Sequence, residues 1–201
     1  MSDNIFNPTH QETNLSNKIV AGLERVSEAF KVLLWEKAKL FGLSPIQIQI
    51  LIFINYHKIE FCNVSHLAKE FNVTKPTISD AVKVLVNKQL IDKVISSSDS
   101  RRYAIQLSDS GKTMVSEIEN FAQPLKNQLI NINNEDLEST FKTLSQLIYK
   151  LNQIGILTVQ RTCYACKFYQ KSDNNHFCNL LEKELLNSEI RIDCGEFETK
   201  V

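Results

Sequence analysis

The chain has 201 residues, of which 43% are hydrophobic and 23% are charged, and its 23 basic residues equal its 23 acidic ones. This is ordinary globular composition, long enough for one sizeable core plus an appendage, and the few glycines and prolines favour helices. No apolar run approaches the roughly 20 residues that span a bilayer, and the first residues lack a secretory signal, so we expect a cytoplasmic protein with no membrane partner.

The N-terminal part predicts a flexible segment followed by a long helix. Residues 1–14 are polar, and we expect them to be frayed. Residues 15–41 repeat apolar side chains at spacings of three and four, and Gly42 suits the position that ends a helix. A helix this long beside a small domain often packs on a second chain.

A capping box marks the next helix. Ser44-Pro45-Ile46-Gln47 combines an N-cap, a proline at the first helical position and a reciprocal glutamine. Residues 46–50 alternate like a strand, but the apolar run continues through Ile54, and a helix can bury it whole. We therefore predict a buried helix.

Two short helices and a hairpin follow. Residues 64–71 carry one apolar face, Asn72-Val73 forms a turn, and residues 75–87 carry a second apolar face behind the N-cap Thr74. This predicts a helix-turn-helix over 64–88, whose second helix is suited to a DNA groove. Residues 91–107 then read as two strands around a serine-rich turn, so the whole predicts a winged helix.

Charge supports DNA as the partner. Residues 64–113 carry eight basic and five acidic side chains, a net charge of +3 in a chain that is neutral overall. We expect Thr77 and Ser79 to contact base edges, and Lys83 and Arg102 to contact phosphates. The full expected DNA-binding set is Ser65, Lys75, Thr77, Ser79, Lys83, Arg101 and Arg102.

Four segments of this region resemble the MarR family of multiple-antibiotic-resistance regulators. They are Leu43-Ser44-Pro45-Ile46-Gln47, Val64-Ser65-His66-Leu67-Ala68, Leu85-Val86-Asn87-Lys88-Gln89-Leu90-Ile91, and Asp99-Ser100-Arg101 with Leu107-Ser108 and Gly111. The resemblance covers about residues 15–155. Gln89 departs from it, because the family carries glycine there.

The resemblance implies a mainly α fold with a small β-hairpin wing, dimerised through its long N- and C-terminal helices. It also implies a homodimer that binds double-stranded DNA at a pseudo-palindromic operator, with Arg101 oriented by Asp99 at the wing tip. A small-molecule effector is a further possible partner. Whether binding represses or activates is left open.

Two more helices precede the tail. Ser108 caps a helix running to about residue 132, which Pro124 should kink. Asn134 caps the next helix, whose heptad-like apolar spacing ends at Gly155. The alternatives are a bundle within one chain and a dimer interface. We favour the dimer, because a palindromic site needs one.

Residues 156–201 form a cysteine-rich tail. It holds Cys163 and Cys166 as a C-x2-C pair, Cys178 after eleven intervening residues and Cys194 after fifteen more, with a short helix expected over 179–188. Four thiolates suit a closed structural zinc site, and metal binding would stabilise a segment too small to fold on its own. We leave His176 out of the ligand set.

Three alternatives to zinc stay open. An iron–sulfur cluster uses the same four thiolates, and Cys163 with Cys166 could form a reversible dithiol switch. The cysteines could also merely pack. Cys62 stands apart, and we interpret it as a small buried hydrophobe rather than a sensor thiol.

Two other classes of function are an enzyme and a protein-interaction module. The sequence has no His-Glu-x-x-His motif, no spaced acid–base pair and no glycine-rich phosphate loop, and four cysteine ligands leave no open metal position, so we do not expect an enzyme. A winged helix that binds another protein is the remaining alternative.

Overall fold

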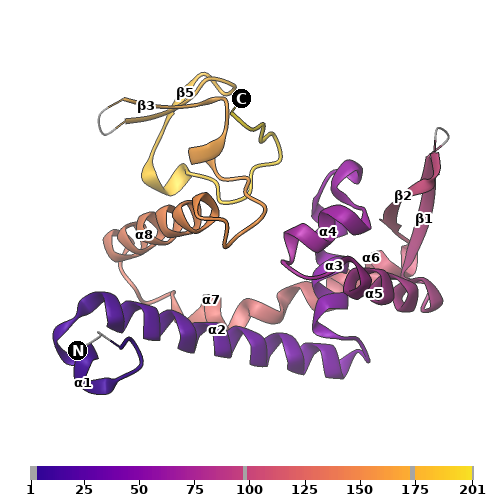
Figure 1. Cartoon of the computed structure of the whole chain (residues 1–201), viewed down its shortest axis with the longest axis horizontal. Coiled ribbons are helices and arrows are strands. Elements are labelled where there is room, and N and C mark those ends of the chain that lie inside the picture. Colours follow the sequence, from indigo (N-terminus) through magenta and orange to yellow (C-terminus); the bar gives the residue numbers. More distant parts are fainter. Residues whose placement is uncertain (1–3, 97–98, 173–174, 201) are drawn as a thin grey trace.

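The computed structural model describes residues 4–96, 99–172 and 175–200, and at 95, 96 and 99–102 it describes the backbone alone. Figure 1 shows a long helix, α2, along one side of the molecule. The winged helix lies at the C-terminal end of α2, and α8 with the C-terminal tail lies above its N-terminal half. The fold is mainly helical with two small antiparallel sheets.

The N-terminal segment is more ordered than we predicted. α1 (Pro8–Thr13) begins at the N-cap Asn7, whose side chain accepts a hydrogen bond from the Thr9 N–H. Asn14 then caps α2 (Leu15–Leu40), and α2 stops before Gly42 at φ +60°. The expectation of a frayed segment was therefore wrong for α1, because a capping side chain and a first-turn proline favour a helical turn there.

The winged helix contains the main core. Its elements are α3 (Pro45–Tyr56), η1 (Ile59–Phe61), α4 (Val64–Glu70), α5 (Lys75–Asn87), β1 (Ile91–Ser96) and β2 (Asp99–Leu107). Residues 46–50 are helical, and at the start of this helix the Ser44 N–H donates to the Gln47 side-chain oxygen at 2.9 Å. The largest fully buried side chains are Ile48, Ile50, Leu51, Leu67, Ile78, Leu85, Ile91, Ile105 and Ile118.

The backbone at the junction between α5 and the wing shows why glycine suits position 89, where this chain has Gln89. Gln89 adopts φ +58°, the left-handed conformation that glycine tolerates best. The Ser108 hydroxyl donates to the Gln89 carbonyl at 2.6 Å and accepts from the Gly111 N–H at 3.0 Å. A Cβ atom at Gly111 would lie 1.9 Å from the Leu90 carbonyl oxygen, so this close approach requires glycine.

The prediction of one kinked helix over 108–132 was wrong. The chain forms α6 (Asp109–Ile118), a 3-10 turn η2 (Glu119–Ala122) and α7 (Gln123–Gln128). Pro124 has no N–H to donate and its ring clashes with the preceding turn, so a new helix begins there instead of the old one bending. α8 (Asn134–Gln153) follows, and its N-cap is Asn133, one residue before the position we predicted.

The tail contains a small sheet instead of the predicted helix. After η3 (Cys163–Ala165), the strands β3 (Tyr169–Ser172), β4 (Asn175–Cys178) and β5 (Lys183–Leu185) pair antiparallel in that order, and η4 (Asn187–Glu189) follows. The helix expected over 179–188 was wrong because β4 and β5 turn back on each other, with Glu182 at φ +52°. Leu185 is thereby buried opposite His176.

No single helix in the described part of the chain is long and apolar enough to cross a membrane. α2 and α3 together meet that test of length and composition, but they are bent by 91°. Ile48, Ile50, Leu51, Phe53 and Ile54 of α3 are buried in the winged-helix core.

Candidate nucleic-acid interface and cysteine cavity

Helix α5 presents one face to the core and the other to solvent. Thr74 caps it, accepting a hydrogen bond from the Thr77 N–H at 3.3 Å, and Pro76 lies in the first turn. The buried face consists of Ile78, Ala81, Val82 and Leu85. Burial of this face fixes the roll of the helix, so its opposite face stays available to a partner.

The residues that we expected to contact DNA are distributed over this exposed surface as follows. Lys75, Thr77 and Lys83 on α5 are exposed, and Ser79 is half-buried. Ser65 is exposed on the first turn of α4. Arg101 and Arg102 belong to β2, but their side chains and the expected contact with Asp99 lie outside the described residues.

Two polar contacts modify these roles. The Lys83 Nζ lies 2.9 Å from the Asp80 Oδ1, so part of its charge is balanced on its own helix. Both side chains are about 70% exposed, so a phosphate could compete for the lysine. The Thr77 and Thr74 hydroxyls lie 2.8 Å apart, which engages the Thr77 hydroxyl in the cap.

Sequence reasoning missed one cation in the wing. Lys93 lies on β1 with its Nζ 4.7 Å from the centre of the Tyr103 ring on β2. A cation held against an aromatic face keeps its charge while its side chain is ordered. No pattern in the sequence marks this contact, because Lys93 follows Asp92 directly and the ring that it meets lies on the partner strand.

Helix α2 and the segment that follows α7 leave many large apolar side chains exposed, whereas the apolar side chains of α8 are half-buried. In α2 only Asn17, Leu34 and Ala38 are buried, and in α8 only Ser145 is. The large apolar side chains left exposed include Leu15, Ile19, Val20, Val26, Val32, Trp35, Leu129, Ile130 and Ile132. Exposed apolar area on this scale is typical of an interaction surface.

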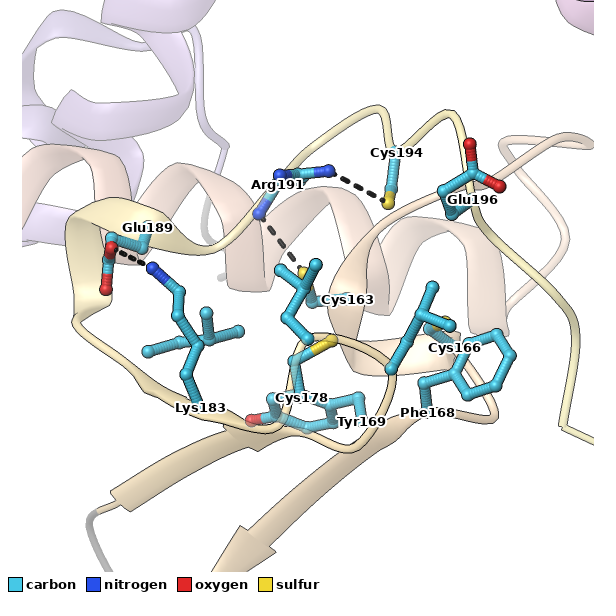
Figure 2. A pocket seen from close by; sticks show the side chains of 13 residues that line it. Cys163, Cys166, Phe168, Tyr169, Cys178, Lys183, Glu189, Arg191, Cys194 and Glu196 are labelled. Carbon is cyan, nitrogen blue, oxygen red and sulfur yellow. Dashed lines mark hydrogen bonds and ion pairs between the residues drawn. The ribbon is translucent and has the colours of Figure 1, made fainter.

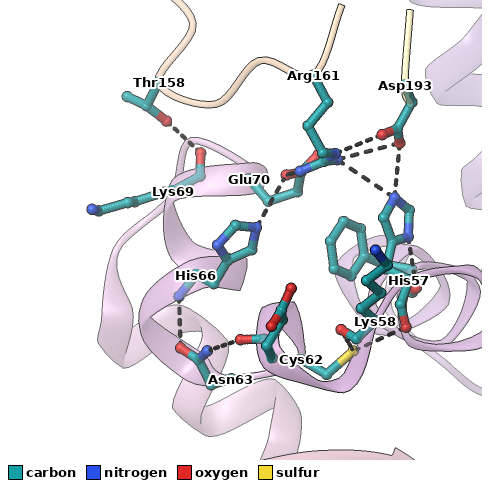
Figure 3. Close-up of polar contacts among 12 residues, drawn as sticks. His57, Lys58, Cys62, Asn63, His66, Lys69, Glu70, Thr158, Arg161 and Asp193 are labelled. Carbon is teal, nitrogen blue, oxygen red and sulfur yellow. Dashed lines mark hydrogen bonds and ion pairs between the residues drawn. The ribbon is translucent and has the colours of Figure 1, made fainter. Parts of the chain in front are cut away.

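The tail is fastened to the winged helix by an ionic cluster, which we call the clasp: His57, Glu70, Arg161 and Asp193 (Figure 3). Arg161, only 7% exposed, donates to both carboxylate oxygens of Glu70 at 2.8 and 3.0 Å. Its Nε donates to the Asp193 Oδ1 at 2.5 Å, and His57 contacts the other Asp193 oxygen at 2.8 Å. The clasp joins the C-terminal turn of α4 to the tail.

The clasp also has an electrostatic signature. Burial alone would raise the pKa of Asp193, but hydrogen bonds from Arg161 and His57 outweigh it, so that this pKa lies below its ordinary value. The linker contributes two further contacts to the same end of α4. Thr158 donates to the Lys69 carbonyl, and Asn72 donates to the Ile156 carbonyl.

The four tail cysteines line one cavity of about 240 Å³ (Figure 2). Cys163 and Cys166 lie at the two ends of the η3 turn, Cys178 ends β4, and Cys194 lies in the loop after η4. The remaining walls are mostly apolar and include Phe168, Tyr169, Leu180, Leu181 and Leu185. The fold thus gathers thiols from three separate segments.

Arg191 donates hydrogen bonds to two of these sulfurs. Its backbone N–H lies 3.3 Å from the Cys163 Sγ, and its Nη1 lies 3.6 Å from the Cys194 Sγ. The pKa of Cys163 lies above its ordinary value, mainly because the thiol is buried. The hydrogen bond from the Arg191 N–H lowers this pKa, and the other three thiols raise it. Across the described residues, no three His, Cys, Asp or Glu side chains are arranged to hold a metal ion directly.

His176 does not line the cysteine cavity. It is buried, with one ring nitrogen 2.5 Å from the Tyr169 hydroxyl and the other 3.1 Å from the Asn187 side-chain oxygen. Cys62 is buried in the winged-helix core, as expected, and burial raises its pKa to about 11.

Comparison with known proteins supports the winged helix. Residues 41–102 match the sequence model of the MarR family. No curated protein matches the chain. The fold class, a winged helix, is shared with several solved structures.

Three solved structures to which this chain is similar are compared by sequence identity, coverage and TM-score. MarR of Staphylococcus aureus in complex with salicylate and kanamycin is 18% identical, covers 73% of this chain and 99% of its own, and has a TM-score of 0.61. The transcriptional regulator PA3341 is 20% identical, with coverages of 67% and 98% and a TM-score of 0.58. The S. aureus MepR–DNA complex is 23% identical, with coverages of 64% and 94% and a TM-score of 0.56.

Proposed function

We propose that this chain is a DNA-binding transcription regulator that recognises a pseudo-palindromic operator as a homodimer. The single observation that carries the proposal is the placement of α5. Its apolar face is buried in the core, its capped N-terminal turn is exposed with Lys75 and Thr77, and a two-stranded wing follows it directly. This is the arrangement in which a recognition helix enters the major groove and a wing reaches the adjacent backbone.

The comparisons support this proposal at the level of fold and family model. The MepR structure in the comparison is a DNA complex, and PA3341 is described as a transcriptional regulator. The match to the MarR family model spans 41–102, a range that holds α3, α4, α5 and the start of the wing. A DNA target agrees with the cytoplasmic location that we propose. Binding of a small-molecule effector stays a prediction.

The homodimer is supported by the uncovered face of α2 and by the exposed apolar side chains that follow α7, Leu129, Ile130 and Ile132. A second copy of the chain would cover these exposed apolar side chains by two-fold symmetry, and such dimers are the commonest oligomers. A symmetric pair would also present two copies of α5, as two half-sites of a palindrome require.

The tail is proposed as a metal-binding module in which Cys163, Cys166, Cys178 and Cys194 are the ligands. Zinc and an iron–sulfur cluster are the two candidates for the bound group. The convergence of four thiols on one cavity supports either of them, and the ordering of a short three-stranded sheet around it gives the metal a structural role.

Fluorescence anisotropy tests the DNA-binding proposal. The probe is a labelled duplex carrying the intergenic region upstream of the gene for this chain, with a scrambled duplex of equal length as competitor. Lys75→Ala should weaken binding roughly tenfold or less, and binding should fall steeply with salt. Lys171→Ala, which removes an exposed lysine from β3 in the tail, is the matched control and should bind like the unmodified protein.

Two results would count against the proposal. Binding of the upstream duplex no tighter than that of the scrambled duplex would remove sequence recognition. If Lys75→Ala and Lys171→Ala lowered the affinity for the upstream duplex equally, α5 would not be the contact surface. That result would favour a winged helix that binds another protein.

A further inference from the structure

The cysteine cavity is large for a single metal ion. A structural zinc ion holds four sulfurs at about 2.3 Å from one point and has no open coordination position. Here the four cysteines line a cavity of about 240 Å³, whereas one water molecule accounts for roughly 30 Å³ of liquid. Figure 2 shows the four labelled cysteines among the side chains that line this cavity.

The origin of the ligands points the same way. Zinc sites of the ribbon type use two C-x2-C pairs, each a tight turn that places both sulfurs on one ion. This tail has one such pair, Cys163 and Cys166, in which the Cys166 N–H donates to the Cys163 carbonyl at 2.9 Å. Cys178 and Cys194 come singly from a strand end and a loop, so they can approach an extended group from separate directions.

The surroundings of the sulfurs suit a cluster. Aromatic and leucine side chains make much of the wall apolar, and Lys183, Glu189 and Glu196 line the rest beside Arg191. The polarity of the shell around a cluster tunes its redox potential. Arg191 donates to the Cys163 and Cys194 sulfurs, and hydrogen bonds to ligating sulfurs tune the potential of iron–sulfur clusters. A cationic guanidinium also balances part of the negative charge that four thiolates would carry.

We propose that Cys163, Cys166, Cys178 and Cys194 hold a four-iron, four-sulfur cluster in this cavity. Each thiol releases its proton as its sulfur bonds to one iron. The inference rests on the metal-binding part of the proposed function and is independent of the DNA-binding part. Through the clasp, the cluster is connected to the helix-turn-helix, because Arg161 precedes Cys163 by two residues and Asp193 precedes Cys194 by one.

The test is metal analysis of the whole protein purified without oxygen. The measurements are the visible absorption spectrum and the iron, acid-labile sulfide and zinc content per chain, before and after reconstitution with ferric iron, sulfide and a thiol reductant. We expect a brown protein with four irons and four sulfides per chain. Cys178→Ser and Cys194→Ser should each lose most of the bound iron and sulfide.

Cys62→Ser is the matched control, because Cys62 lies in the winged-helix core and donates only to the His57 and Lys58 carbonyls. It should retain the full cluster. If a tail variant fails to fold, the analysis of the unmodified protein still decides the question.

The outcomes separate the two proposals. One zinc per chain with no sulfide overturns the cluster and keeps the four-thiolate site. No metal after reconstitution overturns both the cluster and the metal-binding part of the proposed function. Full cluster content in Cys178→Ser and Cys194→Ser overturns this ligand set. None of these metal contents by itself contradicts the DNA-binding part of the proposed function, which is tested by measuring DNA binding on the same preparations.

Discussion

At the scale of single residues, Arg161 connects the two parts of the chain. It is nearly buried, and it joins Glu70 of α4 to Asp193 of the tail while its guanidinium lies 5.5 Å from the centre of the Phe53 ring. Sequence reasoning did not identify it, because an arginine between a linker and a cysteine pair carries no motif. Its partners lie 91 and 32 residues away, beyond any local pattern.

Arg161→Ala should therefore destabilise the protein more than the loss of an exposed ion pair would. Removal of one partner leaves the Glu70 carboxylate, whose side chain is 18% exposed, without its cation. We expect the free energy of unfolding, measured by urea titration, to fall by about 2–3 kcal/mol. This is less than the cost of breaking a fully buried pair, because Asp193 is partly exposed.

Lys167→Ala is the control for that experiment. Lys167 forms an exposed pair with Glu198 in the same tail, and its loss should cost about 1 kcal/mol or less. If the two variants lost the same free energy of unfolding, the clasp would contribute no more to stability than a surface ion pair does.

At the scale of elements, local signals predicted the starts of several helices well and the tail poorly. Thr74, Ser44 and Ser108 cap their helices as expected, because a cap depends on hydrogen bonds between near neighbours. The helix predicted over 179–188 is a turn and a strand, because pairing with residues 176–178 decides its conformation. Long-range pairing overrides the local pattern there.

The uncovered face of α2 makes an element-scale prediction. Val26 is 56% exposed on this helix, and a charged side chain there would have to be buried if a second copy covers it. Val26→Glu should shift the protein from dimer to monomer in analytical ultracentrifugation, raising the dimer dissociation constant by roughly tenfold or more.

Ile59→Glu provides the comparison, because Ile59 is 51% exposed on η1 in the winged helix, away from the long helices. It should leave the association state unchanged. A Val26→Glu protein that stays dimeric at all concentrations would place the interface elsewhere.

At the scale of the whole molecule, the sequence predicted the mainly helical winged-helix fold and the segment that carries it. The cysteine spacing also singled out four residues that the structure gathers on one cavity. The docking of the tail on α3 and α4 could not be predicted, because it depends on the linker route and on the clasp. Glu70 of the clasp lies four residues before Thr74, the cap of α5, so the tail is attached close to the proposed DNA-binding helix.

The most direct test of the account is a hydroxyl-radical footprint on the duplex upstream of the gene. The account predicts two protected patches related by a dyad, with centres about 10 base pairs or a multiple of that apart, since two copies of α5 would enter successive major grooves. A single protected patch would contradict the symmetric dimer, and a uniform pattern at saturating protein would contradict sequence-specific binding by this winged helix.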